Sequence, residues 1–207
     1  MSGRQSTEER KTQIVAEVLR LADEIGPDRL STTDVARAIG LSQPAIFRHF
    51  PTKGALWLAV AEDIADRLQG SWAAAEAEAA GPKARLRGLI GAQLSVISET
   101  PALPSILFSR ELQVDNQALR DVFRKLLGAF QARLVAVIRD SQATGDLRCQ
   151  VSPEDVAILL TSLVQGVAIR WTLGARGFSL LQEGLRLFDV QLALLTAQED
   201  VSNEETR

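Results

Sequence analysis

Apolar residues recur at intervals of three and four along most of the chain, which is the spacing of helices that bury one face. The stretch from Leu119 to Ile138 is the longest example. Signals for strands are scarce, because the chain has no tyrosine, no convincing alternation of apolar and polar residues and no Asn-Gly hairpin turn. The sequence therefore predicts an all-α fold.

Capping residues and helix breakers divide this pattern into about nine helices. A capping-box pattern at Ser6 and Glu9 begins the first helix, and Gly26-Pro27 ends it. The other helices are predicted over residues 31–40, 43–50, 52–81, 86–100, 106–114, 119–145, 152–174 and 179–197. Three short N-terminal helices are thus expected to be joined by a long fourth helix to a C-terminal helical bundle.

The composition fits a soluble globular protein, with 46% apolar and 24% charged residues. No uninterrupted apolar run approaches the roughly 18 residues that a membrane span needs. Met1 leads into charged residues rather than into the apolar core of a signal peptide. We therefore expect a cytoplasmic protein without membrane contact. The single cysteine, Cys149, cannot form an internal disulfide and is expected to be a small, half-buried apolar residue.

The net charge of −3 gives the whole chain little attraction to nucleic acid. The charge is unevenly distributed, because residues 1–60 hold eight Lys and Arg against seven Asp and Glu, while the rest of the chain is acidic. This weak asymmetry favours DNA contact at the N-terminal end, with few phosphate contacts and little non-specific affinity.

An enzyme is hard to reconcile with the residues present. With one histidine, one cysteine and no Gly-rich phosphate loop, the sequence suggests no pair of nucleophile and base and no metal cluster. Glu76 and Glu78 lie in an alanine-rich helical end, where solvated charge is the better interpretation. We therefore expect no catalytic residues, no metal and no cofactor.

The second and third predicted helices have the spacing of a helix-turn-helix motif, because both are short and Gly40-Leu41 joins them. Spacing alone is a weak signal. The third helix strengthens it, since its predicted outer face is polar while Ile46 and Phe50 can pack inward. The residues of that outer face are Gln43, Ala45, Arg48 and His49.

The segment from Leu30 to Phe50, LSTTDVARAIGLSQPAIFRHF, followed by PTKGAL, closely resembles the DNA-binding domain of the tetracycline-repressor (TetR) family of transcriptional regulators. Gly145-Asp-Leu before Ser152-Pro-Glu is similar to the family's regulatory domain, with much lower specificity. The resemblance implies a helix-turn-helix DNA-binding domain over residues 1–52, a ligand-binding and dimerisation domain over 53–198 and a flexible tail over 199–207.

By this resemblance, the start of the third helix lies in the major groove of double-stranded operator DNA. Gln43 would pair with adenine, Ala45 would contact a thymine methyl group and Pro44 would make an apolar contact. Phe47 stands where the family more usually has tyrosine, so one hydrogen bond from a hydroxyl to phosphate is lost. The other implied contacts are those of His49, Lys53, Thr32 and Arg48 with phosphate and of Thr33 with a base.

Each of these residues also has a plainer interpretation. Surface Gln and Thr residues are usually only solvated, Phe47 can be a core residue and Lys53 can be solvated beside the helix cap. His49 has no second histidine or nearby cysteine with which to form a metal site, so phosphate contact or packing is preferred.

The resemblance also implies a homodimer. One reading helix covers only a few base pairs, so two copies are needed, each on one half-site of a pseudo-palindromic operator. The predicted interface residues lie in the last two helices and suit close packing: Leu163, Gly166, Leu185, Phe188 and Leu192. For each of them, a place in the core of its own chain is the alternative.

An unknown small-molecule effector, apolar or amphipathic, is implied inside the bundle. The candidate pocket residues combine polar groups with aromatic rings: Gln93, Phe108, Glu111, Phe123, Phe130, Arg170 and Trp171. We expect the effector to alter the tilt of the fourth helix and so release DNA, with repression as the commoner outcome in the family.

Two alternatives keep this fold. In one, the C-terminal domain binds a protein partner or only dimerises; in the other, DNA binding is lost and a helical binding module remains. A large internal cavity would favour the sensor, whereas a filled core with an exposed apolar patch would favour the partner-binding protein.

Overall fold

The computed structural model describes residues 6–147 and 151–196, and these residues form ten α-helices without a strand. The all-α prediction is therefore confirmed. The helices are α1 (Thr7–Ile25), α2 (Thr32–Ala38), α3 (Gln43–His49), α4 (Lys53–Glu78), α5 (Pro82–Glu99), α6 (Leu103–Phe108), α7 (Arg110–Asp115), α8 (Gln117–Ala143), α9 (Pro153–Leu173) and α10 (Leu180–Thr196). Cys149 and the predicted tail lie outside the described residues.

The tenth helix arises because the single helix predicted over residues 106–114 is interrupted. Ser109 has an extended backbone with φ −65° and ψ 112°, which ends α6. Its hydroxyl then accepts a hydrogen bond from the N–H of Leu112, at 3.0 Å, and caps α7. The prediction of about nine helices was therefore one short within the described residues.

Local chemistry explains the helix-turn-helix arrangement. Ser31 and Asp34 form a reciprocal capping box that begins α2. Gly40 has a positive φ of 66°, a backbone conformation that favours glycine, so the chain can turn sharply between α2 and α3. Pro44 lies in the first turn of α3, where the missing N–H leaves no bond unmade. Ser42 is the N-cap of α3, but its side chain makes no capping hydrogen bond.

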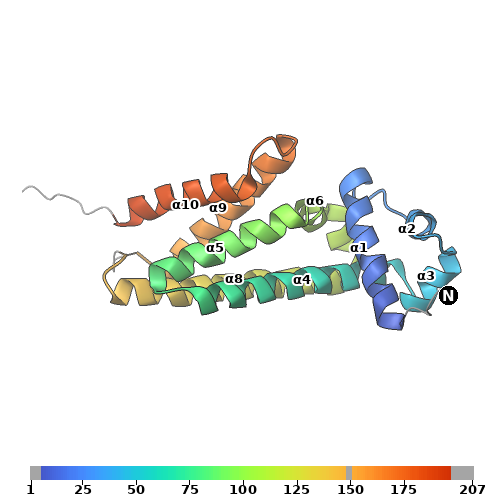
Figure 1. Cartoon of the computed structure of the whole chain (residues 1–207), viewed down its shortest axis with the longest axis horizontal. Helices are drawn as coiled ribbons and strands as arrows, with labels where there is room; N and C mark the ends of the chain where they lie inside the picture. The colour runs from blue at the N-terminus through green and yellow to red at the C-terminus, as the bar shows by residue number, and fades with distance from the viewer. Residues whose placement is uncertain (1–5, 148–150, 197–207) are drawn as a thin grey trace, which may run out of the picture.

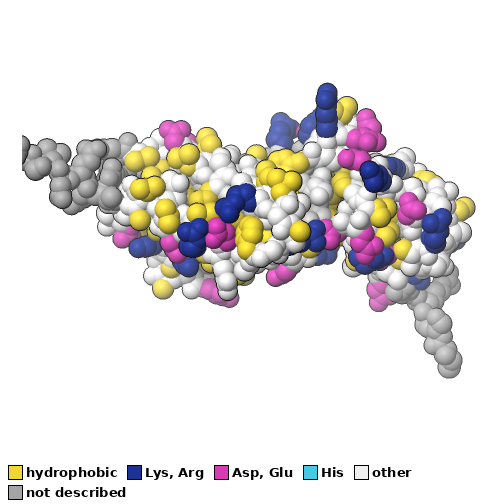
Figure 2. Space-filling model, turned by 90° about the horizontal axis from the view of Figure 1, so that it is seen from above, with side chains coloured by type: hydrophobic (Ala, Val, Ile, Leu, Met, Phe, Trp, Pro, Cys, Tyr) yellow, Lys and Arg dark blue, Asp and Glu magenta, His cyan; other side chains and the backbone are white. Residues whose placement is uncertain are grey.

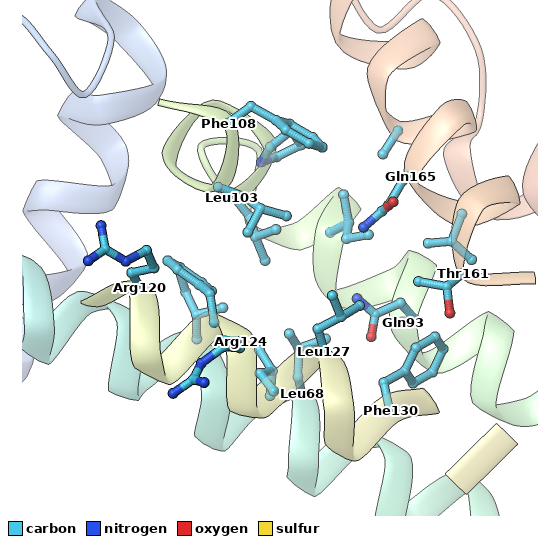
Figure 3. Close-up of a pocket in the computed structure, with 18 of the residues that line it drawn as sticks. Leu68, Gln93, Leu103, Phe108, Arg120, Arg124, Leu127, Phe130, Thr161 and Gln165 are labelled. Carbon is cyan, nitrogen blue, oxygen red and sulfur yellow. The ribbon is translucent and has the colours of Figure 1, made fainter. Parts of the chain in front are cut away.

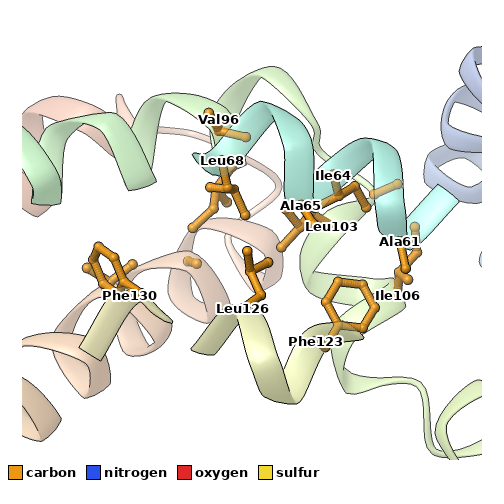
Figure 4. Packing of buried hydrophobic residues seen from close by; sticks show 14 of the residues in the cluster. Ala61, Ile64, Ala65, Leu68, Val96, Leu103, Ile106, Phe123, Leu126 and Phe130 are labelled. Atoms are coloured by element: carbon orange, nitrogen blue, oxygen red, sulfur yellow. The ribbon is translucent and has the colours of Figure 1, made fainter. Parts of the chain in front are cut away.

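The molecule is elongated, with α1, α2 and α3 at one end (Figure 1). The long helix α4 runs from this end alongside α5 and α8. Its buried face includes Ile64 and Leu68, which pack towards Phe123, Leu126 and Phe130 of α8 (Figure 4). One helix therefore belongs to the packing of both regions, because α4 also contacts α1.

Helix α10 packs unusually closely on α5. A Cβ atom at Gly184 would lie 2.5 Å from Cδ1 of Leu94, so a larger residue there would force the Leu94 side chain to shift. This approach buries the inner face of α10, so that Phe188 is fully buried and Leu192 is 6% exposed. Both residues are thus part of the protomer's own core.

Helix α9 is long and apolar enough to cross a membrane when judged by length and composition, and 44% of its most apolar window is buried. It is the one described helix that passes this test. Core helices of soluble proteins pass it too. Thr161, Ser162 and Gln165 interrupt its apolar residues, so the helix does not contain the uninterrupted run that a spanning segment usually has.

Candidate functional site

Helix α3 presents a continuous exposed surface at the end of the molecule. Gln43, Pro44 and Arg48 are exposed, and the Phe47 ring is 38% exposed. On the opposite side, Ile46 is fully buried in the core. The helix is therefore anchored by its apolar face and leaves its other face free for a ligand of matching shape.

Gln43 is held in place by Thr32 at the start of α2. The side-chain Nε2 of Gln43 donates a hydrogen bond of 2.9 Å to the Thr32 hydroxyl, which is buried. One N–H and the carbonyl oxygen of this amide stay unbonded within the described chain, and these are the donor and acceptor that a bidentate contact with adenine requires.

The other residues predicted to contact DNA differ in exposure. Thr33 and Lys53 are exposed, whereas Ala45 is only 8% exposed and shows little of its methyl group to solvent. His49 is half-buried, and its Nδ1 atom has no hydrogen-bond partner in the described structure. Lys53 occupies the first position of α4, at the end of a helix where a cation is unfavourable unless an anion is nearby.

A pocket of about 530 Å³ lies within the helical bundle, between α4, α5, α6, α7, α8 and α9 (Figure 3). Its lining is mainly apolar and, within residues 6–147 and 151–196, includes two arginines but no carboxylate. The lining residues are Ile64, Leu68, Trp72, Gln93, Ile97, Leu103, Pro104, Leu107, Phe108, Gln113, Arg120, Phe123, Arg124, Leu126, Leu127, Phe130, Thr161, Val164, Gln165 and Ala168. Its volume is within the range of small-molecule sites.

Four of the seven residues proposed for an effector site line this pocket: Gln93, Phe108, Phe123 and Phe130. The structure places the other three elsewhere. Glu111 is exposed on α7, and Arg170 lies 3.6 Å from Glu183 of α10. The indole N–H of Trp171 donates to the carbonyl oxygen of Phe178, so this residue shapes the turn between α9 and α10.

Trp72 and Gln93 form the polar contact at the inner end of the pocket. The indole N–H of Trp72 donates to Oε1 of Gln93 at 2.9 Å. Phe130 stacks on Trp72 with ring centroids 5.1 Å apart, and the Arg133 guanidinium lies 5.8 Å from the centroid of the Trp72 ring. Within the described chain the Gln93 amide N–H groups and the Gln165 side chain have no partner, so both can bind a ligand.

Two residues at the ends of the short pocket-wall helices contact the N-terminal helices. The Ser109 hydroxyl, between α6 and α7, donates to Asp28 in the loop that follows α1. The Asn116 side chain, which caps α8, donates a hydrogen bond of 2.9 Å to the carbonyl oxygen of Gly54 in the first turn of α4. The pocket wall and the helix-turn-helix region are therefore directly connected.

The predicted interface residues divide into two groups. Gly166 is exposed on α9 with open space around it, and Leu163 and Leu185 are half-buried, whereas Phe188 and Leu192 are buried in the protomer. Sequence reasoning missed several large apolar side chains that α9 and α10 expose: Ile158, Leu159, Ile169, Leu173, Val190 and Leu194. Figure 2, which views the side that carries α9 and α10 in Figure 1, shows hydrophobic side chains gathered there.

The shifted pKa values among the described residues belong to groups that form capping hydrogen bonds or ion pairs within the chain. Hydrogen bonds from the Ser31 hydroxyl and backbone lower the pKa of Asp34, which ties this carboxylate to the α2 cap. Side-chain hydrogen bonds from Arg186 lower the pKa of Glu183. No group of three or more metal-ligating side chains occurs in residues 6–147 and 151–196.

Comparison with known families agrees with this geometry. A family model described as bacterial regulatory proteins, tetR family, matches residues 14–60, and a model described as BetI-type transcriptional repressor, C-terminal, matches residues 82–195. The chain belongs to the TetR family. It is therefore a DNA-binding transcriptional regulator, and its helix-turn-helix is the family's DNA-binding element.

Individual relatives and solved structures share about a quarter or less of their residues with this chain. The nucleoid occlusion factor SlmA of Vibrio atlanticus is 25% identical over 198 residues, which cover 96% of this chain and 99% of that protein. The fold is shared with a TetR-family regulator from Rhodococcus sp., with 22% identity, a TM-score of 0.77 and coverage of 91% and 100%. A transcriptional regulator from Saccharomonospora viridis in complex with choline has 24% identity, a TM-score of 0.76 and coverage of 87% and 95%.

Proposed function

We propose that this TetR-family protein is a ligand-responsive one-component repressor, which binds a pseudo-palindromic operator as a homodimer and is released by a small apolar or amphipathic effector. Residues 1–52 bind DNA, and residues 53–198 bind the effector and the second protomer. The observation that carries this proposal is the pocket of about 530 Å³, because a bundle used only for dimerisation has no need for such a cavity.

The contacts at the pocket wall supply a route from effector to DNA. An effector that displaces α6, α7 or the start of α8 acts on the hydrogen bonds that Ser109 makes with Asp28 of the DNA-binding domain and that Asn116 makes with Gly54 in the first turn of α4. Because α4 lines the pocket and begins at Lys53, a change in its tilt also moves α3. Effector binding then lowers the affinity for DNA through α4, the helix that both regions share.

Gln43 is the principal base-reading residue in this proposal, because its amide is exposed and oriented by Thr32. Thr32 acts through Gln43, since the structure buries its side chain. In this proposal Pro44, Ala45 and Thr33 lie beside Gln43 in the major groove of the operator. The phosphate contacts come from Arg48, His49 and Lys53, and the Phe47 ring packs on the sugar.

The homodimer forms through the exposed apolar faces of α9 and α10. Gly166 lies on the same face of α9 as Leu159 and Leu173, which allows a second α9 to approach closely. Leu173 is 82% exposed in the single protomer, and burying such side chains provides the driving force for association.

The effector hypothesis is tested by screening small molecules for those that both raise the thermal midpoint and release a bound operator. Ala168 lines the pocket, so Ala168→Phe fills it, whereas Ala129→Phe adds the same ring on the exposed side of α8. Ala168→Phe is expected to bind operator and to ignore the effector, and Ala129→Phe to respond as the wild type does. A screen that yields no compound with both effects refutes effector sensing.

A second candidate function rests on exposed apolar residues beside the pocket, in a chain whose relatives carry the name nucleoid occlusion factor. In that case the C-terminal domain binds a protein partner instead of a small molecule. The exposed Phe108 and Val114, on the two short helices beside the pocket, offer a surface for such a partner. The second function is favoured if the wild type captures a partner protein, Val114→Asp abolishes this capture and no effector is found.

A further inference from the structure

The charge of the pocket lining narrows the chemical class of the effector. Among the described residues that line it, Arg120 and Arg124 are the two charged ones, and none is Asp or Glu. Both arginines come from the first turns of α8 and lie on the same side of the pocket, with their guanidinium groups directed outward at its edge, while Phe130, Gln93 and Thr161 lie on the opposite side (Figure 3). The pocket thus has one end with positive charge and one end with apolar and neutral polar groups.

The length of the apolar part favours a chain-like molecule. The eleven residues of α8 from Arg120 to Phe130 span about 15 Å along the helix axis. Leu126, Leu127 and Phe123 lie between these ends and line the pocket with hydrocarbon and aromatic surface. A ligand with an extended apolar portion matches this hydrocarbon and aromatic surface.

The arrangement around Trp72 argues against a cationic ligand. A cation is best bound over the face of an indole ring. Here Phe130 stacks on Trp72, and the Arg133 guanidinium already lies over the same ring. Arg133 is in turn paired with Glu76, so this carboxylate is also occupied.

In the described part of the chain, Arg120 and Arg124 are held only by interactions that an acid group can replace. Arg124 pairs with Asp121 at 3.0 Å, and its side chain is 73% exposed, so this ion pair contributes little. Arg120 is exposed and donates to the carbonyl oxygen of Gln113. A carboxylate offers either guanidinium a charged acceptor, which makes a stronger hydrogen bond than a neutral carbonyl does.

We propose that the effector is an amphipathic anion, whose apolar chain occupies the pocket and whose acid group binds Arg120 and Arg124 at the rim. This inference rests on the proposed function of the same pocket. Binding of the acid group draws Arg120 away from Gln113, which loosens the turn between α7 and α8. Asn116 lies in that turn, so the hydrogen bond to Gly54 is the contact through which the acid group acts on α4.

The test uses calorimetric titration of the full chain with three probes of equal chain length: decanoate, 1-decanol and decyltrimethylammonium. Decanoate is expected to bind at least about tenfold more tightly than the cation. Arg120→Gln and Arg124→Gln should each weaken decanoate about three- to tenfold and leave 1-decanol unchanged. Lys125→Gln, which removes the same charge from an exposed position of α8 outside the pocket, should change neither.

Arg120→Lys keeps the charge and should retain the preference for decanoate, which separates loss of charge from a damaged fold. Equal binding of decanoate and decyltrimethylammonium, unchanged decanoate binding by both glutamine variants, or binding of no probe overturns the inference. Operator release is measured in parallel. Arginine-dependent binding of decanoate without release contradicts the proposed function alone, and release by a screened compound with no probe bound contradicts the anion inference alone.

Discussion

The side-chain amide of Asn116 donates a hydrogen bond of 2.9 Å to the backbone carbonyl of Gly54, and so joins the start of α8 to the first turn of α4. The same side chain accepts a hydrogen bond from the N–H of Leu119 and caps α8. A Cβ atom at Gly54 would lie 3.5 Å from the Asn116 side chain, which shows how closely the two segments approach. One residue thus starts a pocket helix and contacts the DNA-binding end.

Replacing Asn116 with serine tests whether this contact stabilises the DNA-binding arrangement. Serine can still cap α8 but is too short to reach Gly54. A hydrogen bond of this kind contributes about 0.5–1.5 kcal/mol, so operator affinity should fall about two- to tenfold while the thermal midpoint changes little. Fluorescence anisotropy with labelled operator measures the affinity. An unchanged affinity would remove this contact from the coupling route.

Lys53→Ala should weaken binding to all DNA sequences by a similar factor. Lys53 is exposed at the first position of α4 and is expected to contact phosphate, which carries no sequence information. The slope of log affinity against log salt concentration should decrease by about one. Lys125→Ala, which removes a charge from an exposed position of α8 outside the helix-turn-helix region, is the matched control. A changed base preference in Lys53→Ala would show that the residue reads bases.

Thr32→Val tests the orientation of Gln43. Valine has nearly the same shape and fits the buried position, but it cannot accept the hydrogen bond from Nε2 of Gln43. Discrimination should weaken at one base position, in the same direction as in Gln43→Ala and to a smaller extent. Binding to a panel of operators with single base changes measures this effect. If Thr32→Val weakened all operators equally, Thr32 would have a role in phosphate contact or stability.

Leu159→Asp should convert the dimer to monomers, because it places a charge on the exposed apolar face of α9. Val114→Asp makes the same kind of change at a residue that is 64% exposed on α7, outside that face. Sedimentation equilibrium should give a monomer for the first variant and a dimer for the second. Operator affinity should fall about tenfold or more in Leu159→Asp, since one half-site is lost.

The α2 cap should make stability depend on pH in acid. Hydrogen bonds from Ser31 lower the pKa of Asp34 in the folded state below its ordinary value of 3.8. Stability from this carboxylate is therefore fully present above that value and is lost as the pH falls through the folded pKa. Asp34→Asn should lower the thermal midpoint at pH 7, and its difference from the wild type should shrink below about pH 4. A constant difference down to about pH 2 would contradict the assignment.

Local sequence signals were sufficient to predict the helix-turn-helix region. Ser31, Gly40 and Pro44 determine the helix ends there through capping, positive φ and ring geometry, which depend on neighbours in the chain. The interruption at Ser109 was missed, because its hydroxyl both caps α7 and binds Asp28, a residue brought near only by the tertiary fold.

The pocket was only partly predictable for the same reason. Aromatic residues such as Phe123 and Phe130 follow the helical period and could be identified, but the period does not say which side of α8 faces a cavity. Arg120 and Arg124 were therefore not among the predicted pocket residues. The burial of Phe188 depends on the close approach of Gly184 to Leu94, so no pattern within α10 could distinguish core from interface.

The central claim is that α3 contacts bases in the major groove and that a homodimer places two copies of α3 on one operator. Selection of bound duplexes from random DNA, followed by measurement of the stoichiometry on the selected sequence, tests it most directly. We predict an inverted repeat bound by paired protomers, with half-sites separated by whole turns of about 34–36 Å. Recovery of no preferred sequence, or of a single half-site bound by one protomer, would contradict the claim.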